Sequence, residues 1–238
     1  MKNILQLLFP AKCPLCGAVL DREEEGICVT CRLHLPEVTE PCCKHCGKPI
    51  MSVEEEYCLD CSHRDSVLEQ GTALWVYTDT MRKAMADFKY QGCLADGDFY
   101  GQEILRAKGE ILKDWNPACI IPVPLHWRRR WFRGFNQAAY ISHVVGEEMG
   151  IPVLEDALLR TRNTSPQKGL NDKQRKENLE DAFAVNPVWL EEIAAYRKVL
   201  LVDDIYTTGA TLETCGLTLK NAGVEKIYFI CLCIGSDC

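Results

Sequence analysis

The stretch KVLLVDDIYTTGATLETC occupies residues 198–215. The apolar run at its start, residues 199–202, is typical of a strand that is buried on both faces of a sheet. Two adjacent carboxylates, Asp203 and Asp204, follow the run, and a turn with three threonines and Gly209 leads into a helical segment. In parallel sheets, ligands lie beyond the carboxyl ends of the strands, where such turns occur. The stretch therefore predicts both the class of fold and the place of a ligand site.

The turn after the two carboxylates has the composition of an anion-binding loop. Backbone amides and threonine hydroxyls at a helix N-terminus can surround a monophosphate, and the helix dipole favours its negative charge. The alternative is an ordinary N-cap turn, which accounts for one Asp and one Thr but not for two carboxylates and three threonines around a glycine. We therefore expect phosphate binding by Thr207, Thr208, Gly209, Ala210 and Thr211.

Strand and helix segments alternate along most of the chain. Apolar runs of strand length are followed by segments that carry apolar residues at helical spacing and end in glycine. This alternation predicts an α/β fold with a mainly parallel sheet and helices on both faces. We expect strands at 72–77, 118–124, 197–204 and 224–235, and helices at 80–92, 99–115, 136–150 and 211–223.

One cysteine pattern occurs twice near the N-terminus. CPLCGAVLDREEEGICVTC, residues 13–31, and CKHCGKPIMSVEEEYCLDC, residues 43–61, each contain two CxxC pairs at the same spacing. Four thiolates form a closed tetrahedral shell with no open position for a substrate, which favours structural zinc. Redox dithiols and an iron–sulfur cluster are the alternatives. The expected ligands are Cys13, Cys16, Cys28 and Cys31 in one copy and Cys43, Cys46, Cys58 and Cys61 in the other.

We assign one zinc ion to each copy, while the spacing alone also allows a cross-braced arrangement that mixes the two copies. Each copy is too small to have a core of its own, so removal of the metal is expected to unfold residues 13–61. A polar junction follows the repeat. We therefore predict two domains, a zinc-ribbon domain at 1–66 and an α/β domain at 67–238.

Length and charge limit the remaining possibilities. The 238 residues have room for one ordinary domain and a small module. The net charge of -7 excludes the uniform basic field of a protein that coats nucleic acid, although a local basic patch remains compatible with it. No stretch approaches the roughly 18 apolar residues of a membrane span, so we expect no membrane insertion. Cysteines paired as CxxC fit metal in a reducing compartment, which predicts a cytoplasmic location.

Residues 198–215 resemble the signature of the type I phosphoribosyltransferases, which is a strand, two acidic residues and a threonine-rich phosphate loop. In that family the loop holds the 5'-phosphate of phosphoribosyl pyrophosphate (PRPP), and the two carboxylates address the ribose hydroxyls, directly or near magnesium. The resemblance implies that Asp203 and Asp204 belong to the catalytic site and that Mg²⁺ is a cofactor. Carboxylates suit this task because they accept hydrogen bonds from hydroxyls and are hard ligands for magnesium.

Several further motifs accompany the double cysteine ribbon. They are LLFP at 7–10, Lys89, Tyr90 and Gly92, IPVPLHWRRRWFRGFNQA at 121–138, and RTRNTSPQKGLNDKQRKENLEDAF at 160–183. With these motifs the whole chain resembles the ComF family, phosphoribosyltransferase-like proteins associated with competence. The resemblance implies a role in DNA uptake, with single-stranded DNA and proteins of the competence machinery as partners.

The first of two basic stretches interleaves arginines with aromatic residues after the strand at 118–124, where the related enzymes have their pyrophosphate loop. Arginines can hold a diphosphate bidentately, and guanidinium groups with aromatic rings also suit single-stranded nucleic acid. The alternative is that the aromatic residues lie in the core and the arginines on a solvated face. The arginines expected to contact pyrophosphate or nucleic acid are Arg128, Arg129, Arg130 and Arg133.

The second basic stretch, residues 160–178, contains six cations. In phosphoribosyltransferases a loop with this placement closes over the diphosphate and excludes water. We expect Lys168 and Arg175 to contact the diphosphate or nucleic acid, with a plain surface loop as the alternative.

Three functions are consistent with these features. The preferred hypothesis is an enzyme that transfers the phosphoribosyl group of PRPP to an unknown acceptor, because positioning and electrostatics can supply this catalysis without a nucleophilic side chain. The second is a non-catalytic module that binds single-stranded DNA. The third is a sensor that binds PRPP or a nucleotide without turnover.

Overall fold

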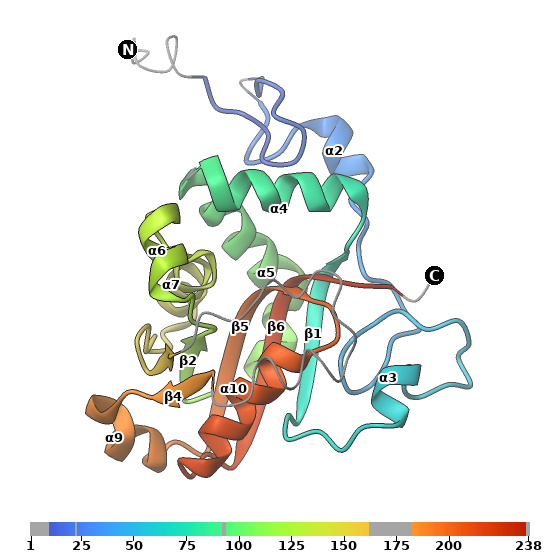
Figure 1. Ribbon diagram of the computed structural model, residues 1–238. Helices are drawn as coiled ribbons and strands as arrows, with labels where there is room; N and C mark the ends of the chain where they lie inside the picture. The colour runs from blue at the N-terminus through green and yellow to red at the C-terminus, as the bar shows by residue number, and fades with distance from the viewer. Residues whose placement is uncertain (1–9, 22, 92–93, 162–181, 237–238) are drawn as a thin grey trace.

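The structure of the protein, a computed structural model, describes residues 10–21, 23–91, 94–161 and 182–236. Its centre is a four-stranded sheet in the order β1-β6-β5-β2, and every neighbouring pair is parallel (Figure 1). β5 and β6 are the inner strands because their continuous apolar runs suit positions that are covered on both faces. The predicted α/β fold is confirmed. The strands are β1 (Gln70–Val76), β2 (Cys119–Pro122), β5 (Lys198–Tyr206) and β6 (Lys226–Ile234).

Helices cover both faces of this sheet, as predicted. Leu200 of β5 packs with residues of α4, α5 and α7, whereas its neighbour Leu201 packs with residues of α10, because side chains alternate along a strand. None of the helices in the described ranges has the length and apolar character that crossing a membrane requires. The four helices are α4 (Asp79–Gln91), α5 (Leu94–Trp115), α7 (Gln137–Met149) and α10 (Ala210–Asn221).

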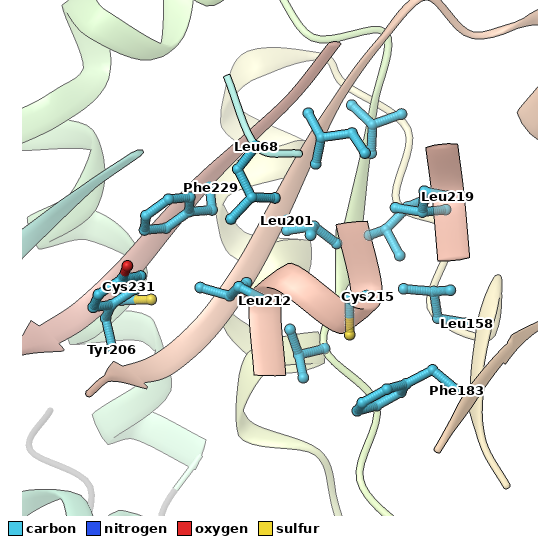
Figure 2. Packing of buried hydrophobic residues seen from close by; sticks show 14 of the residues in the cluster. Leu68, Leu158, Phe183, Leu201, Tyr206, Leu212, Cys215, Leu219, Phe229 and Cys231 are labelled. Atoms are coloured by element: carbon cyan, nitrogen blue, oxygen red, sulfur yellow. The ribbon is translucent and has the colours of Figure 1, made fainter. Parts of the chain in front are cut away.

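The face of the sheet that α10 covers has a closely packed core (Figure 2). Leu212, Cys215 and Leu219 of α10 lie close to Leu201 of β5 and Phe229 of β6, and each of these residues is at most 1% exposed. Interiors packed at this density resist displacement. The N-terminus of α10 therefore has a fixed position relative to the end of β5.

The sequence did not predict the short elements. Runs of three to seven residues are too short to show an apolar period. Helix α6 is defined instead by its two ends. The His126 side chain accepts a hydrogen bond from the Arg128 backbone N–H at the start, and Gly134 ends the helix with φ 83°. β3 and β4 form a separate antiparallel pair. These elements are α2 (Val29–Leu33), α3 (Leu59–Ser62), α6 (Trp127–Arg133), β3 (Leu158–Arg160), β4 (Phe183–Val185), η1 (Pro187–Trp189) and α9 (Leu190–Ala195).

The two cysteine ribbons pack on opposite faces of the sheet. Ile27 of the first ribbon shares a core with Phe99 of α5, and Cys46 of the second ribbon shares the other core with Phe229 of β6. Figure 1 shows the first ribbon, with α2, next to α4, and the second ribbon, with α3, beside β1. Each ribbon therefore contributes to a core of the α/β fold, while the domain boundary at residues 66 and 67 stays a prediction.

The segment that joins the two ribbons covers the outer edge of β1. Glu37 forms a bridge with Trp75, and the Val38 backbone N–H donates to the Leu74 carbonyl oxygen at 2.9 Å. An uncovered strand edge can pair with other chains. The joining segment supplies hydrogen-bond partners for backbone groups along this edge of β1.

Candidate functional site

A pocket of about 400 Å³ lies beyond the carboxyl ends of β2 and β5, between the N-termini of α7 and α10. Asp203 and Asp204 reach it from β5, Thr207 from the loop before α10, Thr211 from the first turn of α10, and Lys89 from α4. The fold thus brings the two predicted carboxylates and part of the predicted phosphate loop to one cavity, where α/β sheets bind their ligands. The other lining residues are Tyr77, Val123, Pro124, Leu125, Arg133, Asn136, Gln137, Ala138, Arg160 and Ile205.

The two carboxylates are not equivalent. Burial, followed by the negative charge of Asp204, raises the pKa of Asp203 to about 7 from its ordinary value of 3.8. The Asp204 backbone N–H donates to Asp203 Oδ1 at 2.8 Å and opposes part of this shift. The ionised form of Asp203 is therefore costly in the ligand-free pocket, and a hydroxyl donor or a cation beside it would stabilise that form.

Lys89 of α4 forms an ion pair with Asp204 through Nζ and Oδ2. Both side chains are only 18% exposed. Burial by itself lowers the pKa of Lys89, but the charge of Asp204 and, less strongly, that of Asp203 outweigh it and raise the pKa above its ordinary value. The Lys89 ammonium is therefore held in its charged form beside the acidic pair. The helical pattern around Lys89 does not distinguish it from a solvated lysine, and the ComF resemblance, which includes Lys89, implied no partner for it.

The loop between β5 and α10 has a backbone that requires glycine at one position. Gly209 has φ 75°, and a Cβ atom there would lie 2.5 Å from the Tyr206 hydroxyl oxygen. No side chain in the described ranges caps α10, so the ligand position at its first backbone amides is not taken by a cap. Thr207 and Thr211 line the pocket, while Gly209 and Ala210 are buried.

The segment after the second ribbon holds this loop in place. Arg64 Nη1 donates to the Thr208 carbonyl oxygen at 2.6 Å. The Ser66 hydroxyl and the Val67 backbone N–H donate to the carboxylate of Glu213, which is in the first turn of α10. Because the peptide plane is rigid, the contact with Arg64 also turns the following N–H away from Arg64. The sequence did not predict this role, since Arg64 lies in a polar junction without a motif.

Two described arginines of the predicted basic stretches line the pocket. Arg133 donates from Nη1 to Gln137 Oε1 at 3.3 Å, and its guanidinium carbon lies 5.2 Å from the centroid of the Tyr90 ring. Arg160 lies over the Phe183 ring at 5.3 Å. Positive charge therefore reaches the pocket from the last residue of α6 and from β3. Lys168, Arg175 and the side chain of Arg129 lie outside the described part of the chain.

Helix α6 carries an exposed group of basic and aromatic residues, Trp127, Arg128, Trp131 and Phe132, which we call the α6 surface. The three aromatic side chains are 63%, 87% and 80% exposed, respectively, so the core alternative is wrong for them. The Arg128 guanidinium lies 5.2 Å from the centroid of the Trp127 ring. Arg130 is not part of this surface, because its Nη2 contacts a glutamate carboxylate, Glu155 Oε1, at 2.9 Å.

Each ribbon brings its four cysteine sulfurs together. In each set the Sγ atoms lie within 4.8 Å of one another, and the Cys16–Cys28 and Cys46–Cys58 pairs are 3.7 Å apart. Tetrahedral Zn–S bonds of about 2.3 Å place sulfur atoms about 3.8 Å apart, so both sets fit zinc. The prediction of one site in each copy is confirmed, and the cross-braced alternative is wrong.

Two family models match parts of the chain. A family model described as the double zinc ribbon domain matches residues 4–62, and one described as the phosphoribosyl transferase domain matches residues 154–237. Competence protein F of Haemophilus influenzae is 30% identical over 222 residues, which cover 92% of this chain and 95% of that protein. The chain belongs to the ComF family.

Further ComF relatives match over a similar length. Competence protein ComFC of Bacillus subtilis is 29% identical over 208 residues, which cover 85% of this chain and 81% of that protein. DNA utilization protein YhgH of Escherichia coli K12 is 27% identical over 231 residues, which cover 95% of this chain and 98% of that protein. The resemblance inferred from the sequence is therefore confirmed for the ribbons and for the phosphoribosyltransferase domain.

The raised pKa of Asp203 predicts that Asp203→Asn stabilises the ligand-free ComF protein at pH 8. The folded state binds this proton more tightly than the unfolded state, so the stabilisation is complete below about pH 4 and is lost as the pH rises through about 7. Asparagine avoids that loss. A full shift of this size corresponds to about 4 kcal/mol, and with structural relaxation we expect about 2 kcal/mol, or a melting temperature raised by roughly 4–8 °C. Thermal unfolding without magnesium measures it.

Asp204→Asn is the matched control for this prediction. It removes the ion-pair partner of Lys89 and leaves a mostly buried ammonium without that partner, so the melting temperature should fall. A fall for Asp203→Asn at pH 8, or a rise for both variants, would contradict the electrostatic explanation.

Proposed function

We propose that this protein binds PRPP with magnesium in the pocket and acts in competence and DNA uptake as a phosphoribosyltransferase-type protein. The observation that carries the proposal is that one pocket is lined both by the acidic pair, Asp203 and Asp204, and by Thr207 and Thr211 of the predicted phosphate loop. A sugar phosphate needs both groups, since its hydroxyls donate to carboxylates and its phosphate accepts from amides and hydroxyls. The names of the relatives, competence proteins and a DNA utilization protein, support the cellular role and partners from the competence machinery.

The loop would hold the 5'-phosphate, and the acidic pair would hold the ribose. The Thr208 hydroxyl oxygen is buried and has no hydrogen-bond partner among the described residues. An isolated buried donor costs roughly 1–3 kcal/mol. Thr208 does not line the pocket, so contact between its hydroxyl and a phosphate would require the loop to shift when the ligand binds. Gly209 supports this assignment, because its backbone conformation brings the chain into a tight turn at the N-terminus of α10.

The opposite side of the pocket would hold the diphosphate. Arg133 and Arg160 line it, and the N-terminus of α7 begins at Gln137, which is 2% exposed. Guanidinium groups and a helix N-terminus both favour a polyanion. The carboxylates of Asp203 and Asp204 are hard oxygen ligands that fit Mg²⁺, which when bound would neutralise charge on the diphosphate.

The proposed reaction is transfer of the phosphoribosyl group to a nitrogen nucleophile, with pyrophosphate as the leaving group. The pocket would supply positioning and charge stabilisation, and this requires no nucleophilic side chain. The experiment measures pyrophosphate released from PRPP with magnesium and a panel of nucleobases and amines. We expect release by the wild type and by Asp114→Asn, an exposed control, and at least about a 100-fold loss in the Asp203→Asn, Asp204→Asn double variant. Absence of release by the wild type with every acceptor would reject transfer.

The α6 surface supports a second function, the binding of single-stranded DNA. Its exposed rings can stack on bases while Arg128 contacts a phosphate. Exposed tryptophan is costly for a protein that does not use it, and two such residues lie on one short helix. The residues of this surface do not line the pocket, although Arg133 at the end of the same helix does. DNA binding can therefore be tested with variants that leave the pocket residues unchanged.

Trp131→Ala is expected to weaken the binding of a single-stranded oligonucleotide by about 5- to 100-fold, because one base loses a stacking partner. Arg128→Ala should weaken binding and also reduce the slope of affinity against salt concentration. Fluorescence anisotropy with a labelled oligonucleotide at several salt concentrations measures both. Arg197→Ala, which removes an exposed arginine at the opposite end of β5, is the charge control and should leave the affinity unchanged. Equal affinities for all three variants would exclude the α6 surface.

A further inference from the structure

The acidic pair of the pocket already has a cation from the protein itself. Lys89 Nζ forms an ion pair with Asp204 Oδ2, and Lys89 lines the same cavity as the phosphate loop. The helix that carries Lys89 cannot easily withdraw it, because the neighbouring Phe88 and Met85 are at most 1% exposed and anchor α4 in the core. Lys89 is therefore a fixed component of the site.

This arrangement solves a specific electrostatic problem. Asp203 and Asp204 are adjacent, and two carboxylates in a poorly solvated site oppose each other's ionisation and repel an anionic ligand. A positive charge within ion-pair distance offsets one of the two, and it does so most strongly where water is largely excluded. A bound divalent cation can offset such charge, and here the Lys89 ammonium lies in position to offset the charge of Asp204.

We propose that Lys89 is a built-in counter-ion that lets the acidic pair bind the hydroxyls of a ribose 5-phosphate without a divalent metal. The need for magnesium would then belong to the diphosphate of PRPP and not to the sugar phosphate. Lys89 prepares Asp204 as an acceptor for a ribose hydroxyl and reduces the repulsion that the phosphate meets on entering the pocket. This inference rests on the proposed function, because it concerns the same pocket.

The test is calorimetry with ribose 5-phosphate, with and without added Mg²⁺. Chelators would remove the structural zinc, so magnesium is removed by passing the buffer over a chelating resin before the protein is added. For the wild type we expect the two affinities to agree within about 3-fold. For Lys89→Gln we expect binding at least about 10-fold weaker without magnesium, and recovery to within about 3-fold of the wild type when magnesium is added.

Two further variants separate charge from structure. Lys89→Arg keeps the positive charge and should bind ribose 5-phosphate without magnesium, as the wild type does. Lys83→Gln removes an exposed lysine from the same helix and should have no effect. Thermal unfolding of each variant establishes that it is folded. Unchanged metal-free binding by Lys89→Gln, or a wild type that needs magnesium for ribose 5-phosphate, would overturn the inference.

A parallel titration with PRPP and magnesium distinguishes failure of this inference from failure of the proposed function. If the wild type binds PRPP with magnesium but binds ribose 5-phosphate only when magnesium is added, the proposed function stands and the role of Lys89 is rejected. If neither ligand binds under any condition, both are rejected.

Discussion

Replacing Cys46 by serine is expected to lower the melting temperature of the whole protein by on the order of 10 °C or more, or to prevent folding altogether. Cys46 is a ligand of the second zinc site and is fully buried. It shares a core with Tyr206 and Phe229, so the loss extends from the ribbon to β5 and β6. The free energy of zinc binding to such a site is also folding free energy, because the unfolded chain has no preformed site. Thermal unfolding combined with metal analysis measures the effect.

Cys16→Ser in the first ribbon is the matched control. Cys16 is also a zinc ligand, but it is exposed, and its ribbon packs against α5 on the other face of the sheet. Both variants should bind one zinc ion fewer than the wild type, with a smaller loss of stability for Cys16→Ser. We also expect Cys46→Ser to lose PRPP binding at temperatures where it remains folded, because Arg64, which follows the second ribbon, donates to the Thr208 carbonyl oxygen in the proposed phosphate loop. A wild-type melting temperature for Cys46→Ser, or loss of PRPP binding in Cys16→Ser, would contradict this assignment.

Gly209→Ala is expected to weaken PRPP binding by about 100-fold, equivalent to about 2.7 kcal/mol. A methyl group at this position meets the Tyr206 hydroxyl oxygen at 2.5 Å. Tyr206 cannot move aside cheaply, because it is 2% exposed and stacks on Phe229 with ring centroids 5.1 Å apart. The loop must therefore shift, and its amides leave the phosphate position. Calorimetry with PRPP and magnesium measures the loss.

Gly223→Ala separates backbone strain from damage to the pocket. Gly223 also has a positive φ, 104°, and lies at the other end of α10, where the nearest atom to a new Cβ would be 3.6 Å away. In both variants the backbone strain at a positive φ lowers the free energy of unfolding by roughly 1–2 kcal/mol. Only Gly209→Ala should lose affinity for PRPP. Equal affinities of the two variants for PRPP would show that the loop does not contribute to the ligand site.

The fold was predictable from local sequence where a segment has one dominant pattern. The uninterrupted apolar run before Asp203 predicts a buried strand. The threonines and Gly209 that follow are typical of a phosphate loop, and few other structures account for them. The repeated CxxC pairs likewise predicted two zinc sites. Sequence alone left the pairing of the cysteines open, because a cross-braced arrangement uses the same spacing, and the proximity of the sulfurs decided it.

The contacts that complete the site join residues far apart in the sequence, and no local pattern predicts them. Lys89 lies on an amphipathic helix, where a lysine is ordinary, and its pairing with Asp204 depends on how α4 packs against the sheet. Arg64 reaches Thr208 only because the second ribbon lies beside β1 and α10. Helix α6 was missed for a different reason, since its exposed tryptophans give it no apolar period.

The central claim is that the pocket between the N-termini of α7 and α10 is a PRPP site, and calorimetric titration of PRPP with magnesium tests it most directly. We predict one binding site for each chain, competition by ribose 5-phosphate, and no measurable binding in the Asp203→Asn, Asp204→Asn double variant. The single variants establish that the acidic pair can be changed without unfolding the protein. A wild type that binds no PRPP, or a folded double variant that binds it as tightly as the wild type, would contradict the claim.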